Sequence, residues 1–131
     1  MTKEETLAKF LEIEDIEEIE ETKWESFEAE GNEYLVLTDD EADRRTADYI
    51  KESVWAFNPS FLVGYLPEGV DEDVIKILQE KYEGANEAIY NMIDDIDQFV
   101  EDAICADGRG HFLSTWNGHE HEQGEYFIYR V

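Results

Sequence analysis

Basic side chains are scarce in this chain of 131 residues, which has ten Lys and Arg against 35 Asp and Glu and a formal net charge of −25 at pH 7. Proteins bind nucleic acids and anionic membranes through clusters of Lys and Arg. The sequence therefore argues against direct binding of DNA, RNA or a membrane surface. A net charge of about 2 to 8 in magnitude is enough to keep a small domain soluble, so solubility alone does not explain the excess.

Cysteine, proline and long apolar runs are also rare. Cys105 is the single cysteine, which excludes an internal disulfide, fits a reducing cytoplasm, and is expected to be buried late in a helix. The first residues lack the apolar stretch of a signal peptide, and no run approaches the roughly 18 apolar residues of a membrane span. Only two prolines and eight glycines are present, with no linker-like stretch and no repeat. These features predict a single acidic globular domain over residues 1–131.

Apolar residues are nevertheless plentiful enough for a core, at 42% hydrophobic and 13% aromatic. Helical spacing of Leu7, Phe10 and Leu11 predicts a short helix over residues 3–12, with a break before residue 15. Residues 24–30 and 33–38 predict a hairpin whose turn lies at Gly31-Asn32.

The middle of the chain is predicted to be helical. Thr38 and Glu41 have the spacing of a capping box, which predicts a helix from there to about residue 57. A further helix is expected around residues 74–82. The clearest periodicity predicts one continuous core helix over residues 85–105, through Ile89, Met92, Ile93, Ile96, Phe99, Val100, Ala103 and Ile104.

The last part of the chain is expected to form a second hairpin. Residues 111–116 and 126–131 are strand-like and flank a polar turn that opens with Asn117-Gly118. Gly108-Arg109-Gly110 is interpreted as a turn. The predicted fold class is α+β, with a small antiparallel sheet from the terminal hairpins packed on a helical middle.

The excess negative charge is concentrated in two segments, because residues 1–30 hold twelve acidic side chains and residues 61–106 hold another twelve. Most solvated helix faces mix charges of both signs to form pairs three or four residues apart, whereas the acidic face of the helix expected over residues 85–105 has no Lys or Arg. Two interpretations stay open: a merely solvated surface, or a surface shaped for a basic partner. For the second interpretation the candidate partner-binding residues are Glu87, Asp94, Asp95, Glu101 and Asp102, with Glu14, Glu17, Glu18 and Glu21.

No catalytic constellation stands out, and we expect a protein that is not an enzyme and that binds no cofactor. Zinc sites need three or four ligands on rigid elements, whereas His119 and His121 are expected on a glycine-flanked loop, so no metal site is predicted. Cys105 has no neighbouring histidine or basic group to activate it, and no Ser-His-Asp arrangement is recognisable. A metal-dependent enzyme using His111, His119 and His121 is the least favoured alternative.

Two stretches carry a resemblance to known proteins. The first runs from Glu33 to Asp43 and continues to Ser53–Asn58, the second runs from Ala106 to Leu113, and the resemblance covers about a third of the chain. They resemble small uncharacterised acidic proteins encoded by bacteriophages and prophages. The resemblance implies a bacterial host cytoplasm and supplies no catalytic residues. At the level of class only, such proteins are similar to the DNA-mimic inhibitors of restriction and CRISPR systems.

The leading functional hypothesis is a phage-type, DNA-mimic inhibitor whose carboxylates replace phosphates in the nucleic-acid-binding groove of a basic host protein, such as a defence enzyme. The alternative is a phage accessory or structural protein. Its charge would only confer solubility, and an aromatic sheet face or Trp55 would form a homodimer.

Overall fold

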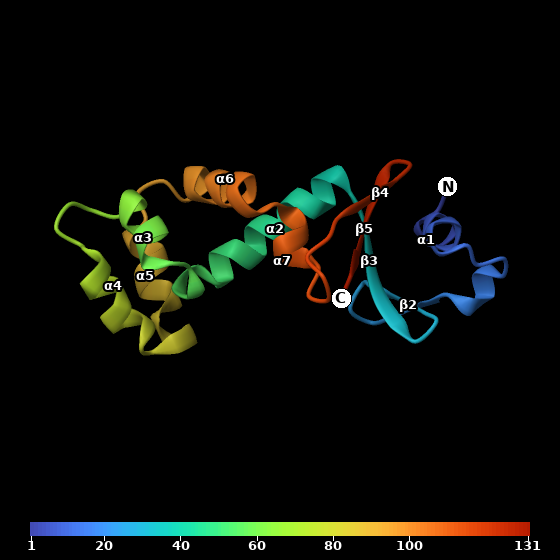
Figure 1. The fold of residues 1–131 in the computed structure, drawn as a ribbon, viewed down its shortest axis with the longest axis horizontal. Coiled ribbons are helices and arrows are strands. Elements are labelled where there is room, and N and C mark those ends of the chain that lie inside the picture. Colours follow the sequence, from blue (N-terminus) through green and yellow to red (C-terminus); the bar gives the residue numbers. More distant parts are fainter. The chain divides into compact units, whose positions relative to one another are not determined.

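A computed structural model describes all residues from 1 to 131, and contacts within the chain divide it into two compact units. The first unit comprises residues 1–46 and 107–131, and the second unit comprises residues 47–106. The single-domain expectation stays a prediction. The α+β class is confirmed, because seven α-helices accompany one five-stranded antiparallel sheet whose strands come from both ends of the chain (Figure 1).

The sheet of the first unit has the strand order β1-β2-β3-β5-β4. The strands are β1 (Glu20–Glu21), β2 (Phe27–Ala29), β3 (Asn32–Thr38), β4 (His121–Gln123) and β5 (Tyr126–Arg130). The pairing of β3 with β5, from Tyr34 opposite Arg130 to Thr38 opposite Tyr126, joins the hairpins of the two chain ends. The predicted first hairpin is confirmed, although its two-residue turn is Glu30-Gly31, where both φ angles are positive as such turns require.

Both faces of this sheet are covered. Helix α1 (Lys3–Leu11), begun by a capping box between Thr2 and Glu5, packs Leu7 and Ala8 on the face that carries Tyr34 and Val36. The opposite face packs against the start of α2 (Asp39–Glu52) and against α7 (Arg109–Leu113), in a core of Leu35, Leu37, Ala42, Leu113 and Tyr129. Since alternate residues of β3 point to opposite faces, two-sided burial explains its unbroken apolar run.

The second unit contains the last part of α2 and a series of short helices. They are η2 (Val54–Ala56), α3 (Pro59–Leu62), η3 (Val63–Tyr65), α4 (Glu72–Gln79), η4 (Tyr82–Ala85), α5 (Asn86–Met92) and α6 (Ile96–Asp107). Its core includes the fully buried Phe99, whose ring lies 5.1 to 5.4 Å from those of Phe57, Phe61 and Tyr65. The spacing of four residues among these three partners places them on one side of the chain around α3.

The predicted continuous helix over residues 85–105 is wrong, because the chain leaves the helical conformation at Ile93 and begins α6 at Ile96. Asp95 accepts a hydrogen bond from the amide of Gln98 at 3.1 Å, as a helix-capping aspartate does. The amide of Asp94 donates to the carbonyl of Tyr65 at 3.0 Å instead of continuing the helix. Two consecutive aspartates thus interrupt an apolar periodicity that is otherwise regular.

Three further expectations need correction. Residues 111–116 do not form a strand, since α7 occupies residues 109–113 and the strand of the second hairpin is β4, with its turn at Gly124-Glu125. The apolar pair Phe112-Leu113 is buried from a short helix, and such short runs do not distinguish strand from helix. The helix that begins after Thr38 ends at Glu52 rather than near residue 57. Cys105 is exposed, not buried.

Candidate functional site

The four candidate residues of the first segment, Glu14, Glu17, Glu18 and Glu21, are exposed and unpaired. Glu17 and Glu18 belong to the short helix η1 (Ile16–Glu18), which Asp15 caps by accepting from the amide of Glu17 at 3.0 Å. Glu14 precedes this turn and Glu21 ends β1. All four candidate residues of this segment lie at the surface, and none forms an ion pair or a side-chain hydrogen bond. This segment therefore presents free carboxylates to solvent.

A row of three glutamates crosses the first three strands of the sheet. Glu20 on β1 lies opposite Glu28 on β2, and Glu28 lies opposite Glu33 on β3. Residues directly opposite each other in an antiparallel sheet point to the same face, and like charges in such pairs are destabilising. Sequence reasoning missed this row, because it requires the strand register; the hairpin turn at Glu30-Gly31 was the one available signal.

The same surface is hollowed. Glu18, Glu20, Glu28 and Glu30 line a shallow hollow of about 190 Å³ beside the β2–β3 turn. None of these four carboxylates has a hydrogen-bond partner within the chain. A cationic side chain that entered the hollow would meet several carboxylates at once.

The second acidic segment is less uniform than its sequence indicates. Glu87 on α5 and Glu101 on α6 are exposed, but the break after Ile93 means that Glu87, Asp94 and Glu101 do not continue along one helix. Asp95 is used as the cap of α6. Glu87, Asp94 and Glu101 recur every seven residues in the sequence, but they do not lie on one face of a single helix.

Asp102 differs from the other candidates because its carboxylate is already engaged. The Tyr65 hydroxyl donates to it at 2.5 Å, and the side-chain amide of Gln98 donates to it at 2.8 Å. The hydrogen bond to Asp102, with smaller contributions from burial and from the carboxylate charge, raises the pKa of Tyr65 to about 12. Asp102 therefore connects α6 to the end of η3 and is half-buried.

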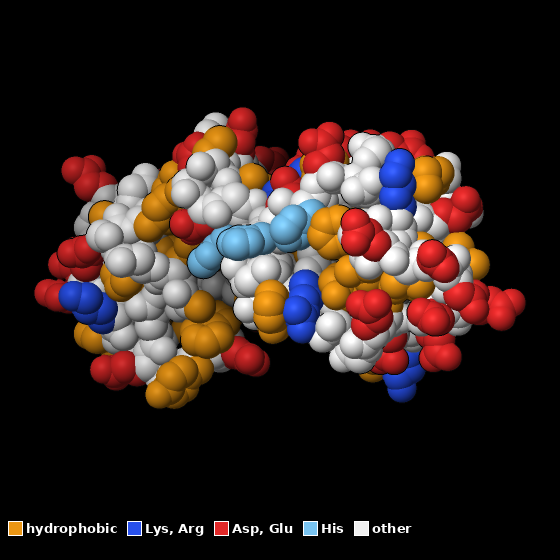
Figure 2. All heavy atoms as spheres, turned by 45° about the vertical axis from the view of Figure 1, so that its right-hand side comes forward, with side chains coloured by type: hydrophobic (Ala, Val, Ile, Leu, Met, Phe, Trp, Pro, Cys, Tyr) orange, Lys and Arg blue, Asp and Glu red, His pale blue; other side chains and the backbone are white.

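The face shown in Figure 2 carries many acidic side chains and few Lys and Arg side chains, set among hydrophobic and uncharged polar surface. The candidate residues of the first segment belong to the first unit, and those of the second segment belong to the second unit. Each unit thus has its own set of candidate carboxylates. Those of the first unit have no partner within the chain, whereas Asp95 and Asp102 of the second unit accept hydrogen bonds.

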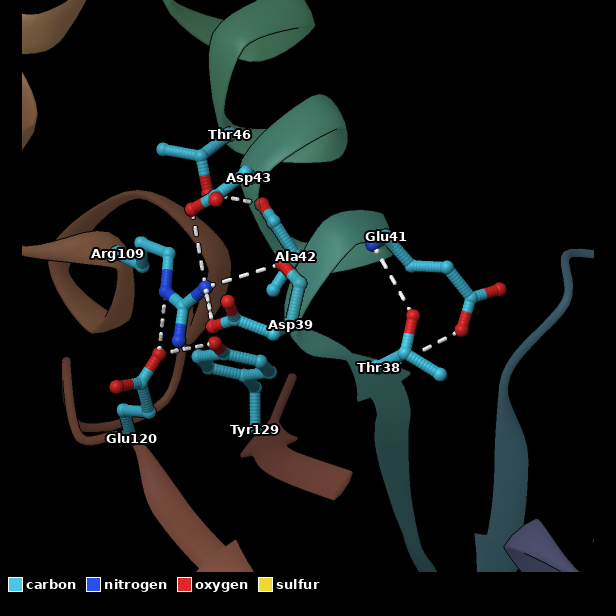
Figure 3. A network of polar contacts seen from close by, with 9 residues as sticks. All are labelled: Thr38, Asp39, Glu41, Ala42, Asp43, Thr46, Arg109, Glu120 and Tyr129. Atoms are coloured by element: carbon cyan, nitrogen blue, oxygen red, sulfur yellow. Dashed lines mark hydrogen bonds and ion pairs between the residues drawn. The ribbon is translucent and has the colours of Figure 1, made fainter. Parts of the chain in front are cut away.

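Arg109 forms the one dense ion-pair network, which sequence reasoning did not find (Figure 3). Its guanidinium donates to Asp39 at 2.9 Å and to Asp43 at 3.0 Å, both on α2, and to Glu120 at 2.8 Å. The side chain is only 11% exposed and lies over the ring of Phe127 at 4.6 Å. The hydroxyl of Tyr129 donates to the same oxygen of Glu120.

Two glycines explain how Arg109 reaches its partners. Gly108 has a φ of +83°, which favours glycine, and it precedes the first residue of α7. Gly110 lies so close to the loop after α7 that an added Cβ would stand 2.5 Å from the carbonyl oxygen of Gly118. The glycine at this position lets the loop, and with it Glu120, approach the guanidinium.

The ionisation of the network follows from its packing. Burial raises the pKa of Tyr129 above its ordinary value, and the hydrogen bond to Glu120 and the charge of that carboxylate raise it further. Burial works to lower the pKa of Arg109, but the hydrogen bonds to Glu120 and Asp39 outweigh it, so the guanidinium stays charged. The network therefore connects α2, α7 and the second hairpin through charged hydrogen bonds.

The histidines form a visible group, coloured pale blue in Figure 2. The rings of His119 and His121 lie 6.1 Å apart, and the ring of His121 lies 5.1 Å from that of Phe10. His121 is on strand β4 rather than on the expected loop. The structure brings together no group of three or more His, Cys, Asp or Glu side chains that could hold a metal ion.

Comparison with protein-family models, with curated proteins and with solved structures gives no match. None of the helices combines the length and the apolar character needed to cross a membrane.

Proposed function

We propose that this protein is a non-enzymatic, phage-type interaction protein that acts in the bacterial host cytoplasm as a DNA mimic. In this proposal its carboxylates occupy the nucleic-acid-binding groove of a basic host protein, such as a restriction or CRISPR-type defence enzyme. The free glutamates of the first unit carry the proposal. The row of Glu20, Glu28 and Glu33 places like charges in register, at a cost in stability that a binding role would explain.

The carboxylates of the first segment are the part of the proposed surface best suited to this role. Glu14, Glu17, Glu18 and Glu21 have no partner within the chain to give up on binding. Binding would then pair them with Lys and Arg that otherwise contact phosphates. In the second unit Glu87, Asp94 and Glu101 are equally free, whereas Asp95 and Asp102 would have to keep their structural contacts.

Replacing Glu14, Glu17, Glu18 and Glu21 together with glutamine is expected to weaken capture of nucleic-acid-binding proteins from a bacterial lysate by about tenfold or more. The matched control replaces four other exposed glutamates, Glu52, Glu68, Glu80 and Glu83, with glutamine and makes the same change in net charge. The captured proteins should be released by duplex DNA and by salt, because both act on charge pairing.

The comparison of these two variants decides the proposal. An equal effect of both would mean that only the net charge matters and that the acidic surface is merely solvated. Capture that persists unchanged from low to high salt, or that duplex DNA does not compete for, would likewise contradict DNA mimicry.

The alternative, a phage accessory or structural protein that forms a homo-oligomer, has one observation in its favour. In the second unit, Ile77 on α4 is 64% exposed and Tyr82 on η4 is 71% exposed, with the ring of Trp55 edge-on to Tyr82 at 6.4 Å. Exposed apolar side chains that lie together are typical of protein interfaces.

Sedimentation equilibrium tests this alternative directly. If these side chains form a homodimer interface, the wild-type protein sediments as a dimer and Ile77→Glu as a monomer, because the new charge would be buried in the contact. A monomeric wild-type protein at concentrations up to about 100 µM, which corresponds to a contact weaker than about 5.5 kcal/mol, would rule this interface out.

A further inference from the structure

A hollow of about 520 Å³ in the first unit shares Glu28 and Gly31 with the small acidic hollow. Its walls include Glu28 and Glu33 from the first hairpin, Asn32 from the turn region, Arg130 at the end of β5, and Trp116 from the segment after α7. Hollows of about 300 to 1,000 Å³ are the size that accepts small ligands or single side chains of a partner.

Trp116 is held in place at this hollow although it is 59% exposed. The guanidinium carbon of Arg130 lies 3.6 Å from the centroid of the indole, and the Trp116 amide donates to the Arg130 carbonyl at 3.4 Å. Arg130 in turn donates to Asn32 at 2.6 Å. Exposed tryptophan that is already ordered is favourable for binding, because little side-chain freedom remains to be lost on association.

Arg130 makes these contacts without forming an ion pair, in a chain where acidic residues outnumber basic ones by more than three to one. It therefore leaves the carboxylates of the same hollow available. Glu33 is oriented by the Ser26 hydroxyl, which donates to it at 2.8 Å, and Glu28 has no partner.

The hollow thus combines an ordered, exposed indole, which the Arg130 guanidinium contacts on one face, with the carboxylates of Glu28 and Glu33. An aromatic face and carboxylates together favour an organic cation, through cation–π attraction and charge-assisted hydrogen bonds. A negatively charged ligand would find one guanidinium but would have to approach a molecule with a net charge of −25.

We propose that this hollow binds an Arg or Lys side chain of a basic protein partner, with Trp116 as the central contact and Glu28 and Glu33 as its charge partners. Arg130 is a positioning residue that holds the indole. The proposal rests on the proposed function for the basic character of the partner, and it adds a specific anchoring point to an otherwise distributed acidic surface.

Titration with the synthetic peptide nona-arginine tests the hollow by itself, with the affinity measured by calorimetry and the indole N–H of Trp116 followed by NMR. Trp116→Ala is expected to weaken binding about 5- to 20-fold, whereas the matched control Trp24→Ala should change it less than twofold. Trp24 is 68% exposed and has Lys23 over its ring at 5.2 Å, but it lines neither of these hollows. Trp116→Leu, which keeps an apolar side chain without the aromatic face, should resemble Trp116→Ala.

A charge control distinguishes binding in the hollow from attraction by the net negative charge of the whole molecule. Glu28→Gln with Glu33→Gln should weaken nona-arginine binding several times more than Glu122→Gln with Glu125→Gln, which alters two exposed glutamates of the second hairpin. A cooperative thermal unfolding transition in each variant would establish that all of them fold. Three results would each overturn the proposal: equal effects of Trp116→Ala and Trp24→Ala, equal effects of the two glutamate pairs, or tighter binding of nona-glutamate than of nona-arginine.

The outcomes also separate this proposal from the proposed function. Loss of lysate capture in the four-glutamate variant, with no effect of Trp116→Ala on either assay, would refute the hollow alone. Trp116-dependent binding of nona-arginine, without DNA-competed capture of nucleic-acid-binding proteins, would leave the hollow standing and refute DNA mimicry.

Discussion

Arg109→Gln is expected to destabilise the first unit by about 2 to 4 kcal/mol. The substitution removes the only positive charge among Asp39, Asp43 and Glu120, so three carboxylates would face one another around a side chain that is 11% exposed. Losing one partner of a buried ion pair costs about 3 to 5 kcal/mol, and the value is reduced here because Asp39 and Asp43 are more than half exposed to solvent. Hydrogen exchange of the β5 amides in urea measures this loss within the first unit.

Two control variants show whether geometry or charge is responsible. Arg109→Lys retains the charge but has no planar guanidinium to contact Asp39, Asp43 and Glu120 together, so it should recover only part of the stability. Arg44→Gln removes an exposed arginine of α2 and should change stability by less than about 0.5 kcal/mol. If Arg109→Gln behaved like Arg44→Gln, the network would contribute no more than an ordinary surface ion pair.

Phe99→Ala should destabilise the second unit by about 3 to 5 kcal/mol. Phe99 is fully buried and contacts the rings of Phe57, Phe61 and Tyr65, so its removal leaves a cavity between α6 and the chain around α3. Urea unfolding followed by far-ultraviolet circular dichroism detects the loss, because the second unit is built of helices. The control Ile77→Ala truncates an apolar side chain that is 64% exposed and should cost less than about 1 kcal/mol.

A small effect of Phe99→Ala would have a definite meaning. It would require the three neighbouring rings to collapse into the vacated space, since the cost of such a substitution depends on how far the site can relax. Retention of the wild-type near-ultraviolet circular dichroism would distinguish that collapse from a core that is loosely packed from the start.

Features that depend on neighbouring residues in the sequence could be predicted. The capping box is one, since Thr38 and Glu41 exchange hydrogen bonds of 3.2 and 2.9 Å at the start of α2, as their spacing indicates. The hairpin around Glu30-Gly31 is another, because its strands are adjacent in the chain. The α+β class followed from the order of such local elements.

Features that depend on distant partners could not be predicted. Arg109 appears in the sequence between two glycines, and nothing local reveals that Asp39, 70 residues earlier, will accept its hydrogen bond. The row of Glu20, Glu28 and Glu33 similarly requires the register of three strands. At Asp94-Asp95 the apolar periodicity on both sides predicts a continuous helix, whereas the capping preference of aspartate favours the break that the structure shows.

The pairing of β3 with β5 also sets the order in which the protein can be completed during synthesis. The whole second unit lies between these strands in the sequence and can fold on the ribosome before β5 exists. Until then β3 has a free edge with four consecutive apolar residues, an arrangement that favours association with other unfinished chains. Residues 12–30, dense in glutamate, precede this edge in every nascent chain, and their mutual repulsion opposes such association. Like-charge repulsion within residues 12–30 thus acts against association of incomplete chains as well as of finished ones.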